Sequence, residues 1–138
     1  MVILKLKERE IPLVYTTLEM LDIQEDIGPI DKAIRTVNGV NPDDDKDLSL
    51  IGGKEQLKAL GAFIRILGNA GLRMNGEEAD LKDREILSWM RPDEILKAVN
   101  ACMDAMQEGM RSEIPEKEET GPVDVTLEEI NKKKVKEN

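Results

Sequence analysis

Three aspartates at alternate positions, Asp43, Asp45 and Asp47, have the spacing of the first ligands of a calcium-binding EF-hand loop. In that loop the sixth position is a glycine that allows a sharp turn, and the twelfth is a glutamate that binds the ion through both oxygens. Here those positions hold Leu48 and Lys54. Because neither residue can do what the calcium geometry requires, we interpret residues 43–47 as a solvated acidic loop.

A second candidate, Gly52-Gly53-Lys54, resembles the end of a phosphate-binding loop. That loop needs another glycine five residues before its second glycine, and a serine or threonine after the lysine to hold magnesium. The corresponding positions are Leu48 and Glu55. We therefore interpret the glycine pair as the start of a helix.

The chain has no histidine and a single cysteine, Cys102. An imidazole base paired with serine or cysteine is thus excluded, as is histidine-ligated zinc. Cys102 falls on the apolar face of a predicted helix without a neighbouring cation cluster, which indicates a core residue. The acidic pairs Glu77-Glu78 and Glu118-Glu119 lie in polar stretches and are interpreted as solvated. We therefore predict a protein that is not an enzyme and has no cofactor or metal.

Charge and length limit the remaining functions. The 138 residues include 29 acidic and 20 basic side chains, so the net charge is −9, which disfavours nucleic acid and anionic membranes as partners. No apolar run approaches the roughly 20 residues of a membrane span, and the charged N-terminal stretch lacks the apolar centre of a signal peptide. We expect one domain in the cytoplasm, with residues 1–113 folded and residues 114–138 forming a flexible charged tail.

The pattern of apolar residues predicts a mainly α-helical domain with a short N-terminal β-hairpin. Strands are expected in 2–7 and 11–15, and helices in 16–27, 30–37, 54–74, 81–90 and from 92 to about 113. Thr16 and Glu19 have the spacing of a helix capping box. Residues 54–74 are apolar over most of the helix circumference, which places this helix at the centre of the domain. Gly61 and Gly68 in it predict a closely packed neighbour.

Four of the seven methionines, Met90, Met103, Met106 and Met110, fall within 21 residues. Methionine fills irregular gaps in protein cores, and it also lines adaptable binding surfaces. The sequence leaves both roles open. For a partner-binding groove these four residues are the candidates, and Met106 and Met110 are the pair that we expect to be exposed.

The order of these elements resembles a known family. The stretch Ile11-Pro12-Leu13-Val14-Tyr15 leads into a helix with an acidic end, and after the central apolar helix Met90-Arg91-Pro92-Asp93-Glu94-Ile95 opens an amphipathic helix. Over residues 1–113 this layout is similar to the tail assembly chaperones of long-tailed bacteriophages and prophages of Gram-positive hosts. The resemblance lies in layout, because that family has no defining catalytic or ligand residue.

The resemblance implies a non-enzymatic role in the bacterial cytoplasm. Such chaperones keep the long tape measure protein in solution, recruit tail tube subunits to it, and are absent from the mature virion. Self-association of the chain is also left open by the sequence. Two alternatives to the chaperone function remain: an acidic regulatory module, of the anti-repressor or nucleic-acid-mimic type, and a small enzyme built on carboxylates. The second alternative requires buried acids, which no helix pattern places.

Overall fold

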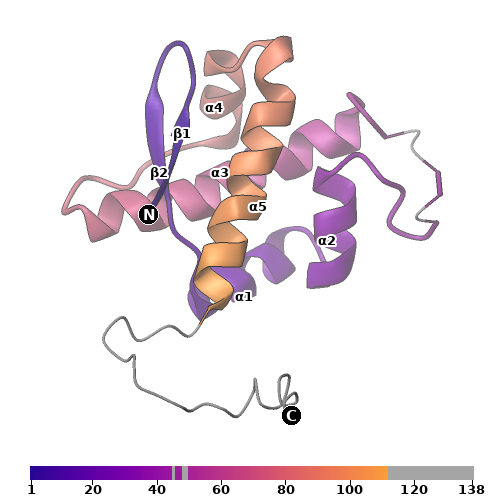
Figure 1. The fold of residues 1–138 in the computed structure, drawn as a ribbon, viewed down its shortest axis with the longest axis horizontal. Helices are drawn as coiled ribbons and strands as arrows, with labels where there is room; N and C mark the ends of the chain where they lie inside the picture. Colours follow the sequence, from indigo (N-terminus) through magenta and orange to yellow (C-terminus); the bar gives the residue numbers. More distant parts are fainter. Residues whose placement is uncertain (45, 48–49, 112–138) are drawn as a thin grey trace, which may run out of the picture.

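The computed structural model of the chain describes residues 1–44, 46–47 and 50–111. An antiparallel hairpin comes first and helices follow, so the predicted fold class is confirmed (Figure 1). The elements are β1 (Val2–Lys5), β2 (Glu10–Leu13), α1 (Thr17–Asp26), α2 (Ile30–Val37), α3 (Lys54–Met74), α4 (Asp83–Trp89), the 3-10 turn η1 (Pro92–Glu94) and α5 (Ile95–Met110). The predicted tail, residues 114–138, lies outside the described residues.

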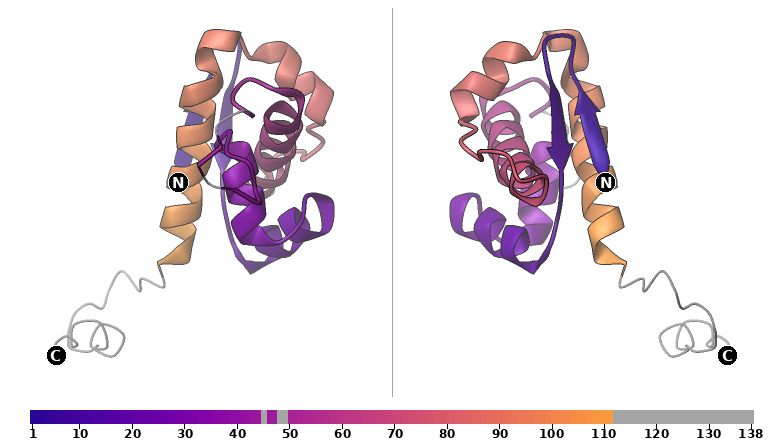
Figure 2. Two further views of the ribbon diagram at one scale, coloured as in Figure 1. Left: turned by 90° about the vertical axis from the view of Figure 1, so that its right-hand side faces the viewer. Right: turned by 90° about the vertical axis from the view of Figure 1, so that its left-hand side faces the viewer.

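The hairpin is two strands wide, with Ile3 opposite Pro12 in the register. Beyond the strands, Leu6 and Arg9 exchange both backbone hydrogen bonds, at 2.8 and 3.3 Å. Hydrogen-bonded and non-hydrogen-bonded pairs alternate along an antiparallel ladder. Counting back from Leu6 therefore makes Ile3 and Pro12 a non-hydrogen-bonded pair, which is where a proline without an N–H fits. β2 packs on α3 and β1 packs on α5 (Figure 2).

α1 begins with the predicted capping box. Oε1 of Glu19 accepts hydrogen bonds from the backbone N–H of Thr16 at 2.8 Å and from its hydroxyl at 2.6 Å. The other oxygen of the buried Glu19 lies 3.6 Å from Arg73 on α3. The cap thus fixes the start of α1 and also ties it to the central helix.

α3 has the bounds that the sequence predicts, and most of its surface is buried. Leu60, Phe63, Ile64 and Leu67 are fully buried. A Cβ atom at Gly68 would lie 2.7 Å from Leu81, so the predicted close neighbour is confirmed there. The closest approach in α3 is at Gly71, which the sequence pattern did not predict: a Cβ atom there would lie 2.2 Å from the carbonyl oxygen of Pro12.

The buried side chain of Gln56 joins the two ends of the loop that connects α2 to α3. Its Nε2 donates to the carbonyl of Val37 at 3.1 Å, and its Oε1 accepts from the backbone N–H of Gly52 at 2.6 Å. The last residue of α2 and the turn before α3 are therefore held together by one side chain.

None of the described helices combines the length and the apolar character that crossing a bilayer requires.

Candidate functional site

The four candidate methionines do not share one surface. Met90 and Met106 are buried, Met103 is half-buried, and Met110 is 71% exposed. The prediction that Met106 and Met110 form an exposed pair is therefore wrong for Met106. Its side chain belongs to the core cluster, whereas Met110 lies one helical turn further on. Their spacing of four residues predicts that they share one face of the helix. It does not predict that the core covers this face at Met106 and no longer covers it at Met110.

The end of the domain is marked by Gly109. A Cβ atom there would lie 2.0 Å from the carbonyl oxygen of Tyr15, so the chain leading into α1 crosses α5 at this point. Met103 faces a different neighbour, because its sulfur lies 3.6 Å from Nδ2 of Asn38 at the end of α2. Met103 therefore packs toward α2.

Met90 lines an apolar groove where α4 ends and α5 begins. The groove has a volume of about 220 Å³ and is lined by Leu57 of α3, Leu87 of α4, Met90, Arg91 and Pro92 of the junction, and Ile95 of α5. Met90 and Arg91 have extended backbone angles, as expected before a proline. This break turns the chain between α4 and α5 and leaves apolar side chains of three helices facing one depression. We call these six residues the Met90 groove.

The wall of the Met90 groove is fixed by the buried Glu94. Its Oε1 accepts from the backbone N–H of Arg91 and its Oε2 from the backbone N–H of Lys7, both at 2.8 Å. These two donors, first Arg91 and then Lys7, hold the pKa of the Glu94 carboxyl below its ordinary value. The tip of the hairpin is thus attached to the junction that forms the groove.

Two further contacts attach the hairpin to the same region. Arg91 forms an ion pair with Glu8 in the hairpin turn. The guanidinium of Arg9 lies 4.4 Å from the centre of the Trp89 ring, which is a cation–π contact. The groove is therefore set on a supported part of the fold, as expected for a pre-formed binding surface.

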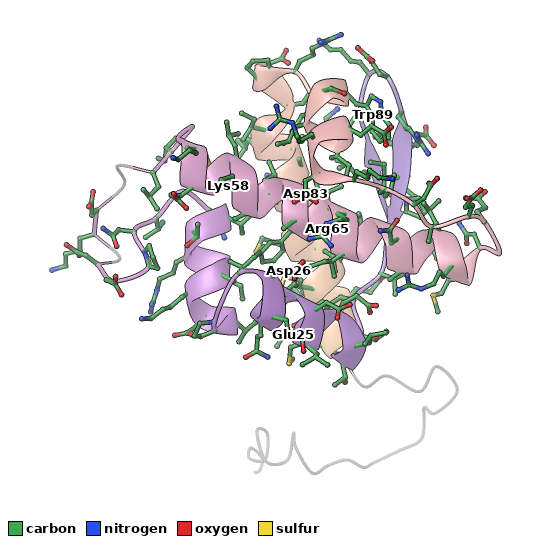
Figure 3. All side chains as sticks on the ribbon, turned by 180° about the vertical axis from the view of Figure 1, so that it is seen from behind. Glu25, Asp26, Lys58, Arg65, Asp83 and Trp89 are labelled. Atoms are coloured by element: carbon green, nitrogen blue, oxygen red, sulfur yellow. The ribbon has the colours of Figure 1, made fainter. Side chains whose placement is uncertain are left out.

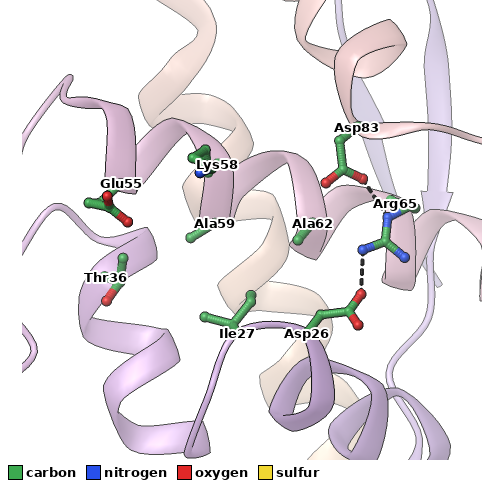
Figure 4. Close-up of a pocket in the computed structure, with 9 residues that line it drawn as sticks. All are labelled: Asp26, Ile27, Thr36, Glu55, Lys58, Ala59, Ala62, Arg65 and Asp83. Atoms are coloured by element: carbon green, nitrogen blue, oxygen red, sulfur yellow. Dashed lines mark hydrogen bonds and ion pairs between the residues drawn. The ribbon is translucent and has the colours of Figure 1, made fainter.

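A second pocket, of about 360 Å³, is lined by both charged and apolar side chains and lies where the end of α1 meets α2, α3 and α4 (Figure 4). Arg65 stands between Asp26 and Asp83 and bonds to both carboxylates (Figure 3). Burial alone lowers the pKa of Arg65, but the hydrogen bonds to Asp26 and Asp83 outweigh it and raise the pKa. With two carboxylates around one guanidinium, this cluster joins three helices and has no net attraction for an anion.

The other candidates of the sequence have structural roles. Among the described residues no group of three or more acidic, histidine or cysteine side chains is placed to hold a metal ion, and Asp45 lies outside them. Gly53 precedes the first residue of α3, as the helix-start interpretation predicts. Cys102 is fully buried, and burial raises the pKa of its thiol to about 12. It is a core residue, as predicted.

Two buried acids are not predicted by the sequence. No helix pattern indicates a buried carboxylate, yet Glu19 and Glu94 are both 2% exposed. The carboxylate of each accepts a hydrogen bond from a backbone N–H at the start of a helical segment. For Glu19 the capping-box spacing was the signal that could have found it. For Glu94 the same three-residue spacing starts at Arg91, a residue type that the capping rule does not include.

Comparison with family models, with curated proteins and with solved structures gives no match.

Proposed function

We propose that this chain is a protein-binding module that holds an apolar segment of its partner in the Met90 groove. The observation that carries the proposal is the groove itself: apolar side chains from α3, α4 and α5 converge on one depression, and its wall is fixed by Glu94. A pocket lined mainly by apolar side chains on a supported scaffold suits an apolar helix or extended segment.

Together with the layout of residues 1–113, the groove supports a tail assembly chaperone as the specific function. The client is then the tape measure protein of a long-tailed phage, a chain with many similar apolar helical stretches, and tail tube subunits are the second partner. Methionine adapts to such clients because its unbranched side chain repacks at little cost. The net charge of −9 helps to keep the chaperone–client complex soluble through mutual repulsion.

The test is co-expression with a phage tape measure protein and measurement of the soluble fraction. The full chain should raise this fraction, and Leu57→Lys in the groove should reduce it toward the value without the chain. Leu57 is partly exposed, so its lysine variant should fold. Leu21→Lys is the matched control, because Leu21 is 49% exposed on α1 and is not among the residues of the groove.

Two results would contradict the proposal. If the tape measure protein is equally soluble without this chain, the chaperone function is wrong, and the acidic regulatory module becomes the better hypothesis. If Leu21→Lys and Leu57→Lys reduce the soluble fraction equally, the client does not use the Met90 groove.

A further inference from the structure

The outer edge of β1 presents one open pair of backbone hydrogen-bonding groups. Because Ile3 and Pro12 form a non-hydrogen-bonded pair, the N–H and C=O of Ile3 point away from β2. The same alternation points the carbonyl of Lys5 outward, and this carbonyl does accept a hydrogen bond from Nζ of Lys97 at 2.9 Å. Lys97 therefore closes one end of the edge and leaves the groups of Ile3 open. Among the described residues, no side chain or loop bonds to them.

The neighbouring surface forms a shallow groove of about 510 Å³ between β1 and α5. Along it the two elements run antiparallel: Lys97 contacts Lys5 at one end, and Glu108 lies 3.5 Å from the Met1 ammonium at the other. Leu96, which is 71% exposed, and Ala101 make the Lys5 end apolar. Asp104 lies nearer the Val2 end, and within the described part of the chain it has no ion-pair partner.

We propose that the β1 edge binds an extended segment of a partner protein as a third, antiparallel strand. The residue opposite Ile3 exchanges both hydrogen bonds with it, and its side chain lies on the outer face beside that of Ile3. The residues on either side point toward α5. An apolar side chain opposite Leu4 meets Leu96 and Ala101, and an arginine or lysine opposite Val2 meets Asp104. From its N-terminus, the preferred segment therefore has an apolar residue opposite Leu4, an apolar residue opposite Ile3 and a basic residue opposite Val2.

Charge and hydrogen bonding both define this partner. The other acid of the groove, Asp93, already has Lys7 at 3.5 Å, so Asp104 is the acid that is left for an incoming cation. At the Lys5 end, the carbonyl that a longer strand would need is already bonded to Nζ of Lys97. The recognised stretch is therefore short. This binding surface does not depend on the Met90 groove and goes beyond the chaperone proposal.

The test is an NMR titration of the full chain with the capped peptide Thr-Leu-Val-Arg-Thr at millimolar concentration. We expect chemical-shift changes at the amides of Ile3, Asn100 and Ala101. Asp104→Lys should lower the affinity for this peptide about two- to fivefold, as for the loss of one exposed ion pair. The same substitution should raise the affinity for the acidic peptide Thr-Leu-Val-Glu-Thr. Glu25→Lys on α1 makes the same change in net charge away from the groove and should leave both affinities unchanged.

A second variant tests the hydrogen bonds. Ile3→Pro removes the outward N–H without removing a bond to β2, and it should abolish the shifts at Asn100 and Ala101. If this variant does not fold, the charge exchange at Asp104 still decides the matter.

Four results would overturn the proposal. The first is the absence of shifts at Ile3, and the second is an equal loss of affinity in Glu25→Lys. The third is a concentration-dependent shift of Ile3 without peptide, which would make a second copy of the chain the occupant. The fourth is a shift of the same amides on removal of residues 112–138, which would make the occupant the chain's own C-terminal part.

Discussion

Lys7 donates its backbone N–H to Oε2 of Glu94 at 2.8 Å, across 87 positions of sequence. Glu94 accepts a second backbone hydrogen bond from Arg91. One carboxylate thereby satisfies a donor in the hairpin turn and a donor at the helical junction. The groove proposed for partner binding depends on this contact, because the contact fixes the position of Arg91 and Pro92 relative to the hairpin.

The first prediction is that Glu94 makes stability depend on acid pH. Its folded-state pKa is below the ordinary value of 4.5, so its contribution is complete above about pH 4.5 and is lost as the pH falls through the folded-state pKa. Glu94→Gln should lower the Tm at pH 7 and flatten the dependence of the Tm on pH below 5. Asp93→Asn, at an exposed neighbour, is the control. An unchanged acid profile in Glu94→Gln would show that the two hydrogen bonds do not favour the ionised carboxyl.

The second prediction contrasts two glycines of α3. Gly71→Ala places a methyl group 2.2 Å from the Pro12 carbonyl oxygen, where backbone has to move, and should lower the free energy of unfolding by about 1–3 kcal/mol. At Gly61 the nearest atom to a new Cβ is a Leu87 methyl carbon at 3.4 Å. Gly61→Ala should therefore be neutral or stabilise the protein by up to about 1 kcal/mol, through helix propensity. Urea unfolding measures both, and equal effects would show that β2 does not pack against Gly71.

The third prediction separates Met106 from Met110. Met106→Lys should destabilise the fold by at least about 2 kcal/mol, because Met106 is only 4% exposed. Met110→Lys should change stability by no more than about 0.5 kcal/mol, because its side chain is already mostly in solvent. Thermal unfolding followed by circular dichroism distinguishes the two. A stable Met106→Lys variant would return Met106 to the surface candidates.

The fourth prediction uses Cys102 as a reporter of unfolding. Burial both hides its thiol and raises the pKa to about 12, so very little thiolate forms at pH 8. At pH 8 a pKa of about 12 leaves about 1000-fold less thiolate than the ordinary pKa of 9.0, so alkylation by iodoacetamide, followed by mass spectrometry, should be at least about 1000-fold slower than in the urea-unfolded chain. Rapid alkylation without urea would mean that α5 opens away from β1 and α3.

The sequence predicted best the elements that local chemistry defines. α3 has its predicted bounds because Gly53 and Asn75 flank it and an apolar surface fills the residues between them. The capping box of α1 was also found, because its two residues are three positions apart. In both cases the signal lies within a few residues of the feature that it predicts.

The features that were missed depend on contacts between distant segments. The Glu94–Lys7 hydrogen bond and the approach of Gly71 to Pro12 connect parts of the chain that no periodicity relates. Arg65 is one of the few polar residues of the apolar helix α3, but only the fold brings Asp26 and Asp83 to it from α1 and α4. For the candidate site, the sequence named Met90 but not the side chains of α3 and α4 that complete its groove.

Gln56 has a practical consequence for labelling the protein. Because this one side chain holds Val37 and Gly52 together, the contact between the two ends of the loop does not use the residues in the middle of the loop. The entropy of closing a loop grows slowly, by about 0.6 kcal/mol for each doubling of its length. An epitope or fluorophore tag inserted after Asp47 keeps the hydrogen bonds of Asp47 to Asn41 and Asp44 on one side of the insertion, and we expect it to be carried as a side branch of the fold. That position gives a handle for following the protein in complexes while the Met90 groove and the β1 edge stay free.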